Sequence, residues 1–192
     1  MIELLLLYCS DYSVARFGEA RKEFPPLGVL YLAAACEQRS IHVRLMDLSQ
    51  IDQGNIPQTD VIGLSINSSY IYPAFKRRIE EIRAKCSMLL AGGQHVTIFP
   101  METSQELNTD YVLVGEGEYT LPELLCRFVR SGFIRGISDI KNVYCPETVY
   151  RAKYTEQTRI RTLDALPFPA RHLLPNEDIM LRRRIPGADV LS

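Results

Sequence analysis

The sequence predicts a Rossmann-like α/β domain, built on a doubly wound, flavodoxin-like, five-stranded parallel sheet with helices on both faces. Short, almost uninterrupted apolar runs alternate five times with segments of helical periodicity, as expected of repeated β-α units. Two of these runs end in glycines: Gly92 and Gly93 follow one, and Gly115 and Gly117 follow the other. Glycine at the carboxyl end of a strand lets the backbone turn sharply or approach a ligand closely. Ligands of open parallel sheets bind at that edge, and five strands favour the order 2-1-3-4-5.

Each element is identified from its apolar pattern. Residues 2–8 are apolar apart from Glu3, as expected of a central parallel strand covered on both faces. Pro26 suits the first turn of a helix, and Thr120 with Glu123 forms the pattern of a capping box. The expected strands are residues 2–8, 42–48, 61–66, 88–91 and 111–114, and the expected helices are residues 26–40, 73–84, 100–107 and a long helix from residue 120.

Three polar features have structural interpretations. A long polar loop from Cys9 to Glu23 follows the first strand, on the same edge as the glycine exits. Asp47 ends the second strand and is interpreted as a strand-end cap, because a ribose-binding acid at this position requires a GxGxxG motif after the first strand, and none exists. The charge run of the helix at 73–84 is interpreted as a solvated face made by Lys76, Arg77, Glu80, Glu81 and Arg83.

The pattern changes after Ser131. Residues 140–144 and 148–151 are expected to pair as a small hairpin around Pro146, and the proline-rich residues 161–169 are expected to form an extended linker. We therefore divide the chain into a Rossmann-like domain, residues 1–131, and a hairpin and linker, residues 132–192, which contain too little apolar sequence to fold alone.

Composition excludes several classes of partner. The 192 residues are 46% hydrophobic, enough for a substantial core. Lys+Arg 22 and Asp+Glu 23 give a formal charge of -1, so neither nucleic acid nor an anionic membrane is an expected partner. The five cysteines show no metal-binding spacing and are expected to be reduced thiols. With no signal-peptide pattern and no apolar run near the roughly 18 residues of a membrane span, a soluble cytoplasmic protein is expected.

Five short motifs in order connect the chain to a known family. They are Pro25-Pro26-Leu27-Gly28, Ser65 with Ser68-Ser69, Gly92-Gly93-Gln94-His95-Val96-Thr97, Gly115-Glu116-Gly117-Glu118, and Leu163-Asp164-Ala165-Leu166-Pro167-Phe168-Pro169-Ala170-Arg171. This set resembles the cobalamin-binding radical SAM proteins, and the resemblance covers nearly the whole chain as that family's N-terminal B12-binding domain plus linker. It implies a Rossmann-like domain that holds cobalamin over the carboxyl edge of its sheet, with the corrinoid's nucleotide tail between sheet and helices.

The resemblance places the cofactor-binding residues in four loops at the edge that the strand pattern also indicates. They are Leu27, Gly28, Ser65, Asn67, Ser68, Ser69, Tyr70, Gly92, Gly93, Gln94, His95, Val96, Thr97, Gly115, Glu116, Gly117 and Glu118. For some of them a structural role is the alternative. His95 is also a candidate cap for the next helix, Glu116 and Glu118 are candidate acceptors for backbone N–H groups at a helix start, and the glycines are candidate tight turns. We assign no catalytic residue and no protein ligand to a metal.

Two motifs found in related proteins are missing. Cobalamin mutases and methionine synthases carry Asp-x-His-x-x-Gly after the first strand, but here Asp11 is followed by Tyr12-Ser13, and none of His42, His95 and His172 stands two residues after an aspartate. Bound cobalamin would then lack a histidine on its lower face. The Cys-x-x-x-Cys-x-x-Cys motif that holds a [4Fe-4S] cluster is also missing. Because the last residues resemble the strand that precedes the cluster loop, we expect a fragment whose radical SAM barrel lies outside this sequence.

The resemblance implies a cobalamin-binding domain of a B12-dependent radical SAM enzyme, with the catalytic domain as its partner in cis. The whole protein would cleave S-adenosylmethionine reductively at a [4Fe-4S] cluster and, like a methyltransferase, move a methyl group, or perform a related radical reaction. Whether this chain alone is an enzyme stays open, as do its substrate and oligomeric state. The alternative is a cofactor-free Rossmann-like docking or regulatory module of a radical SAM protein. A flavin or nucleotide binder is disfavoured, because no phosphate-binding glycine loop opens the first helix.

Overall fold

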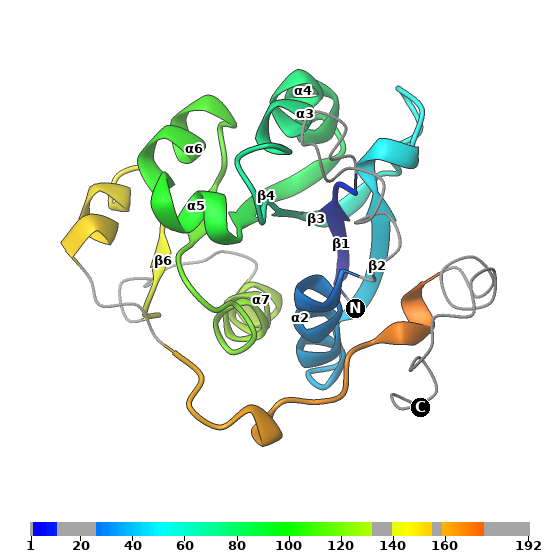
Figure 1. Ribbon diagram of the computed structural model, residues 1–192. Helices are drawn as coiled ribbons and strands as arrows, with labels where there is room; N and C mark the ends of the chain where they lie inside the picture. Colours follow the sequence, from blue (N-terminus) through cyan, green and yellow to red (C-terminus); the bar gives the residue numbers. More distant parts are fainter. Residues whose placement is uncertain (1, 11–25, 132–139, 155–158, 175–192) are drawn as a thin grey trace.

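The computed structural model describes residues 2–10, 26–131, 140–154 and 159–174, which form an α/β domain around one sheet (Figure 1). The strand order is β2-β1-β3-β4-β5-β6. The first five strands are parallel and in the predicted order, so the doubly wound, flavodoxin-like arrangement is confirmed, and a sixth strand pairs antiparallel with β5. The strands are β1 Glu3–Tyr8, β2 His42–Asp47, β3 Thr59–Ser65, β4 Cys86–Gly92, β5 Tyr111–Leu113 and β6 Val143–Tyr144.

Helices cover both faces of the sheet. Figure 1 shows α2 and α7 on one face and α3 to α6 on the other. The helices are α2 Leu27–Glu37, α3 Tyr72–Arg77, α4 Ile79–Arg83, α5 Gln94–Ile98, α6 Pro100–Glu106 and α7 Thr120–Ser131. Short 3₁₀ turns occur at Leu48–Gln50, Val149–Tyr154, Leu163–Ala165 and Arg171–Leu173. No helix in the part of the chain that the structure describes has both the length and the apolar character needed to cross a bilayer.

The apolar run of β1 divides between the two faces. Leu4 and Leu6 pack with Leu124 on the α2 and α7 side, while Leu5 and Leu7 pack on the other side. All four β1 leucines are at most 1% exposed. Because successive side chains of a strand point to opposite faces, a strand covered on both faces must be apolar throughout.

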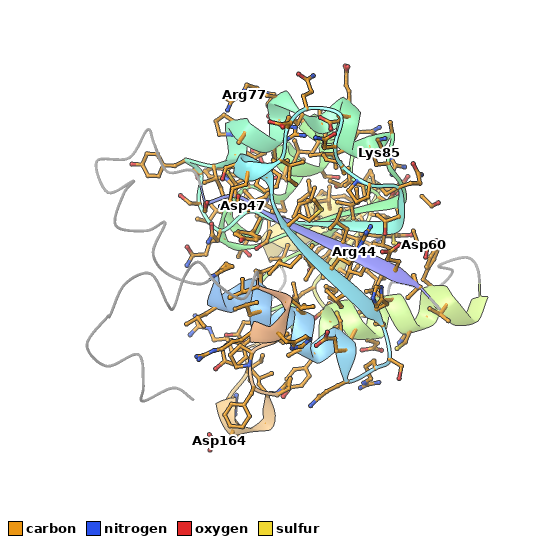
Figure 2. All side chains as sticks on the ribbon, turned by 90° about the vertical axis from the view of Figure 1, so that its right-hand side faces the viewer. Arg44, Asp47, Asp60, Arg77, Lys85 and Asp164 are labelled. Atoms are coloured by element: carbon orange, nitrogen blue, oxygen red, sulfur yellow. The ribbon has the colours of Figure 1, made fainter. Side chains whose placement is uncertain are left out.

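The predicted helix at 73–84 is in fact two short helices that meet at Arg78. Arg78 has φ -110 and ψ 11 and ends α3. Its guanidinium group donates to the backbone carbonyls of Leu48, Ile51 and Asp52 at 3.1, 2.7 and 3.1 Å. The interpretation of the charge run as a solvated face is wrong for Glu81, whose side chain is 15% exposed and pairs with Arg78 at 3.0 Å. Arg78, which that interpretation did not include, ties the turn after β2 to this helix pair. The neighbouring Arg77 is exposed and points away from the sheet (Figure 2).

The predicted hairpin around Pro146 does not form. β6 pairs with β5 instead. Thr148 N and Val149 N both donate to Cys145 O at 2.9 Å, which turns the chain after β6, and residues 149–154 then form a 3₁₀ turn. Ile140, Val149 and Ala152 are buried in the same apolar clusters as the sheet. The division of the chain at residue 131 stays a prediction, although this later segment extends the same sheet.

The start of α7 and the linker also have defined contacts. Thr120 Oγ1 donates to Glu116 O at 3.5 Å, and Glu123 pairs with Arg127 at 2.6 Å, so the predicted capping box is wrong. The linker returns to α2, where Ala170 N donates to Leu30 O at 3.1 Å. Residues 11–23 of the predicted loop from Cys9 to Glu23, together with residues 175–192, lie outside the described residues.

Candidate functional site: a cavity at the carboxyl edge of the sheet

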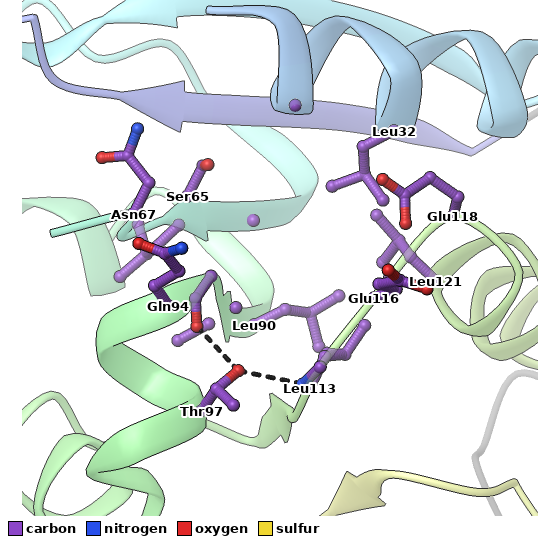
Figure 3. A pocket seen from close by; sticks show the side chains of 18 of the residues that line it. Leu32, Ser65, Asn67, Leu90, Gln94, Thr97, Leu113, Glu116, Glu118 and Leu121 are labelled. Carbon is purple, nitrogen blue, oxygen red and sulfur yellow. Dashed lines mark hydrogen bonds between the residues drawn. The ribbon is translucent and has the colours of Figure 1, made fainter. Parts of the chain in front are cut away.

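A cavity of about 820 Å³ lies between the sheet and the helices α2 and α7 (Figure 3). Four strands contribute Leu6, Gly63, Leu90 and Leu113 to its wall, and Leu32 of α2 and Leu121 of α7 lie opposite. The connections after β1 and β3 pass over opposite faces, so the cavity lies at the switch point in strand order, where open α/β sheets bind ligands. Its size is within the range of about 300–1,000 Å³ that is typical of small-molecule sites.

Two glycines leave space in this wall. A Cβ atom on Gly28 would meet nothing within 4 Å, so the first turn of α2 leaves the cavity open. A Cβ on Gly63, in the middle of β3, would lie 2.9 Å from Leu6 Cδ2. Glycine inside a strand often marks close approach by a ligand or another backbone. Here the missing side chain of Gly63 leaves space in the cavity above the sheet.

Gly93 is required where β4 leaves the sheet. It has φ 107, and a Cβ there would lie 2.6 Å from Ile66 O. The same carbonyl accepts a hydrogen bond from His95 N at 3.0 Å, and Ile66 N donates to Gly92 O at 2.8 Å. The exits of β3 and β4 are therefore held against each other, and only glycine fits between them.

Thr97 joins the second pair of exits. Its hydroxyl donates to Gly93 O at 3.0 Å and accepts from Gly115 N at 2.9 Å (Figure 3). Gly115, like Gly93, has positive φ, 84°. The glycine turns after β4 and β5 thus lie on one edge and line one cavity.

The polar groups of the cavity are neutral on one side and acidic on the other. Ser65, Asn67 and Gln94 lie together, and Glu116 and Glu118 lie across from them beside Leu32 and Leu121 (Figure 3). No lysine or arginine occurs among the described residues of the lining.

The two glutamates differ in their surroundings. The Glu116 carboxylate is exposed and accepts a hydrogen bond from Ile160 N of the linker. Burial raises the pKa of Glu118, and the charge of Glu116 raises it further. Backbone N–H groups of Gly117 and Glu118 interact with the Glu118 carboxylate, yet its Oε2 atom is buried without a hydrogen-bond partner among the described residues.

The structure brings most of the predicted site residues together. The predicted residues that line the cavity are Gly28, Ser65, Asn67, Gly92, Gly93, Gln94, Thr97, Gly115, Glu116, Gly117 and Glu118. The predicted residues outside its lining are Leu27, Ser68, Ser69, Tyr70, His95 and Val96. Leu27 and Tyr70 are 45% and 63% exposed, whereas Val96 is fully buried in the core on the other face of the sheet.

His95 lies on the other side of α5. Its ring stacks on Tyr72 with centroids 4.2 Å apart, and its Nδ1 is 2.9 Å from Ser69 Oγ. Burial lowers the pKa of His95, which favours the neutral ring. The His95 side chain thus packs between α5 and α3 instead of reaching the cavity, and neither His42 nor His172 lines it.

Asp47 has the structural role that the sequence predicts. It is 7% exposed at the carboxyl end of β2 (Figure 2). Its side chain accepts from Ser49 N at 3.0 Å and from Ser10 N at 3.1 Å. The prediction that Asp47 is a strand-end cap is confirmed.

Sequence reasoning missed the apolar part of the lining. The missed residues are Leu6, Leu32, Gly63, Leu64, Leu90, Ala91, Ile98, Leu113 and Leu121. Most are ordinary core residues in sequence, and only Gly63 carries a signal, since a glycine inside an apolar strand is unusual. Among the described residues, no three His, Cys, Asp or Glu side chains are grouped to hold a metal ion.

The fold and the cavity together define a Rossmann-like domain with a cavity at the switch point of its sheet. The family described as B12 binding domain matches residues 14–125, more than half of the chain. The chain therefore belongs to the B12-binding domain family, which confirms the B12-binding domain that the sequence motifs predicted.

Solved structures with the same fold include radical S-adenosylmethionine enzymes. One is the radical S-adenosylmethionine methyltransferase TsrM from Kitasatospora setae with tryptophan substrate and a SAM analog bound, with a TM-score of 0.62 and 16% identity over 76% of this chain and 28% of that chain. TsrM with cobalamin and a [4Fe-4S] cluster bound gives a TM-score of 0.60 and 17% identity over 76% of this chain and 27% of that chain. The cobalamin-dependent S-adenosylmethionine radical enzyme OxsB with aqua-cobalamin bound gives a TM-score of 0.52 and 17% identity over 74% of this chain and 20% of that chain. The chain thus spans less than a third of these proteins. No curated protein sequence matches it.

Proposed function

We propose that this chain binds cobalamin in the cavity, with the nucleotide tail of the corrinoid between the sheet and helices α2 and α7. The observation that carries this proposal is the continuity of the cavity, which connects the glycine exits of β4 and β5 with the apolar space beside Leu32 and Leu121. The residues proposed to hold the corrinoid are the predicted ones that line the cavity: Gly28, Ser65, Asn67, Gly92, Gly93, Gln94, Thr97, Gly115, Glu116, Gly117 and Glu118.

The chemistry of the lining suits this ligand. A corrinoid carries many neutral amide groups, which match the hydroxyl and amide side chains of Ser65, Asn67 and Gln94. Its flat tail base suits a slot between leucines. Flavin and nucleotide cofactors carry phosphates with two or more negative charges, which call for basic side chains or a glycine loop at a helix start. The corrinoid tail carries a single phosphodiester charge, and the described lining contains two glutamates and no basic residue.

Within this proposal the chain is the cobalamin-binding domain of a B12-dependent radical SAM enzyme, with residues 1–131 as the binding domain and residues 132–192 leading to a catalytic domain in cis. That catalytic domain would hold the [4Fe-4S] cluster and S-adenosylmethionine. When bound, cobalamin supplies a cobalt centre that carries a methyl group. The residues of this chain bind and orient the corrinoid, and the proposed reaction of the full-length protein is methyl transfer or a related radical reaction.

The test is direct reconstitution. The purified chain is incubated with hydroxocobalamin under oxidising and reducing conditions and passed over a size-exclusion column, and corrinoid absorbance is expected to elute with the protein at about one equivalent. Gly28→Leu places a side chain in open cavity space and is expected to abolish co-elution while the chain stays folded. Ala84→Leu adds the same side chain at an exposed position on α4's side of the sheet and is expected to have no effect.

A folded chain that retains no corrinoid in any redox state would contradict the proposal. That result would favour the cofactor-free docking module, and affinity of the same preparation for a separately expressed radical SAM domain would then support it.

A further inference from the structure

The carboxyl group of Glu118 has an unused acceptor. Its Oε2 atom is buried, and no described residue donates a hydrogen bond to it. Buried polar atoms in folded proteins are nearly always hydrogen-bonded, because an unpaired one loses its bonds to water without replacement. An acceptor left unpaired in the wall of a cavity is explained most simply by a donor that arrives with the ligand.

The surroundings of Glu118 indicate which part of a ligand it faces. Leu32 of α2 and Leu121 of α7 lie beside its side chain, and the amide side chains of Asn67 and Gln94 lie across the cavity (Figure 3). The loop that carries Glu118 packs on α2, since a Cβ on Gly117 would lie 3.1 Å from Leu32 Cδ1. Glu118 is therefore held where sheet, α2 and α7 meet, in the region that the proposed function assigns to the nucleotide tail.

We infer that Glu118 is a specificity-determining residue, which recognises the nucleotide tail of the corrinoid by accepting at Oε2 a hydrogen bond from an O–H or N–H donor of that tail. The inference rests on the proposed function. Two groups of a tail have this chemistry: a ribose hydroxyl, present in every complete corrinoid, and the amino group of a purine base, which dimethylbenzimidazole lacks. A hydrogen bond to a carboxylate is stronger than one between neutral groups, so its loss is measurable.

The test compares three corrinoids by absorbance titration. Cobalamin has a dimethylbenzimidazole tail, its adenine analogue has a purine tail, and cobinamide has no nucleotide. Glu118→Met keeps the length of the side chain and removes the acceptor. It is expected to weaken cobalamin binding about tenfold or more and to change cobinamide binding by no more than about twofold.

A larger loss for the adenine analogue than for cobalamin identifies the base amino group as the donor, and equal losses identify the ribose. Glu118→Gln keeps a neutral acceptor, should give a smaller loss in the same direction, and carries the test if Glu118→Met fails to fold. Glu123→Gln, an exposed residue of α7 paired with Arg127, is the control and should change no affinity.

Equal weakening of all three corrinoids by Glu118→Met, or weakening of none of them, would overturn the inference while leaving the proposed function intact. A wild-type chain that binds no corrinoid at all would remove both.

Discussion

Thr97 and Gly115 are 18 residues apart in sequence, and the Thr97 hydroxyl accepts a hydrogen bond from Gly115 N at 2.9 Å. The same hydroxyl donates to Gly93 O at 3.0 Å. One side chain thus fixes the spacing of the two glycine turns that follow β4 and β5. The shape of the cavity rim depends on this link, because both turns line it.

Replacing Thr97 by valine keeps the shape of the side chain and removes both hydrogen bonds. Loss of the partner of Gly115 N is expected to lower the free energy of unfolding by about 1–3 kcal/mol, measured by urea denaturation, and to weaken corrinoid binding. Thr103→Val is the matched control: Thr103 is fully buried in α6 on the other face and donates to Phe99 O at 2.7 Å. The control should lose stability but not affinity. Equal effects of the two variants on affinity would show that the Thr97 link does not shape the cavity.

Gly93 and Gly28 should respond to alanine in opposite ways. Gly93→Ala places a residue with a side chain at a positive φ and its Cβ against the Ile66 carbonyl. The free energy of unfolding is therefore expected to fall by about 1–3 kcal/mol or more. Gly28→Ala lies in α2 with open space around its Cβ, so stability should rise by up to about 1 kcal/mol, while corrinoid affinity falls because the methyl group enters the cavity. Thermal denaturation with and without hydroxocobalamin measures both effects. A Gly93→Ala variant as stable as wild type would be inconsistent with the turn described here.

Arg78 should not be replaceable by lysine. Its guanidinium group contacts three backbone carbonyls and pairs with Glu81 at 3.0 Å, with side chains only 16% and 15% exposed. An ammonium group cannot reproduce this planar set of donors, so Arg78→Lys is expected to cost about 1–3 kcal/mol of unfolding free energy. Arg77→Lys, at the adjacent exposed position, should stay within about 0.5 kcal/mol of wild type. A cost for Arg78→Lys no larger than for Arg77→Lys would contradict the structural role of Arg78.

Glu118 should make stability depend on pH. Burial, then the charge of Glu116, raises the pKa of Glu118 above its ordinary value of 4.5. A carboxyl whose folded pKa is raised contributes most to stability below the unfolded pKa, and that contribution is lost as pH rises through the folded pKa. Glu118→Gln is therefore expected to be more stable than wild type at pH 7 and nearly equal to it below pH 4.5. Urea denaturation at several pH values measures the difference in unfolding free energy between Glu118→Gln and wild type. A difference that shrinks as pH rises would contradict the prediction.

The sequence predicted the fold well because the relevant signals are local. Each of the five parallel strands carries its own apolar run, and glycines mark the exits of β4 and β5. Residues 140–144, which contain β6, were predicted to be extended, but the partner was not predicted, since Val143 and Tyr144 pair with β5 instead of residues 148–151. The break at Arg78 was also hidden, because its partners are carbonyl groups about 26–30 residues earlier in the chain.

The candidate site could be predicted at its rim but not in its interior. Loop glycines and polar residues such as Asn67 differ from core sequence, whereas Leu32 and Leu121 line the cavity only because α2 and α7 cross the sheet with space between them. The direction of His95 depends on stacking with Tyr72, a contact between two separate helices. Such contacts are properties of the tertiary structure, which local periodicity does not encode.

The two helical walls of the cavity come from distant parts of the chain, α2 from Leu27–Glu37 and α7 from Thr120–Ser131. During synthesis the first wall leaves the ribosome long before the second. Capture of a ligand in this space must therefore wait until α7 has emerged and docked. A ligand bound between α2 and α7 would hold these two segments together non-covalently, and would stabilise the fully folded chain relative to partly folded ones.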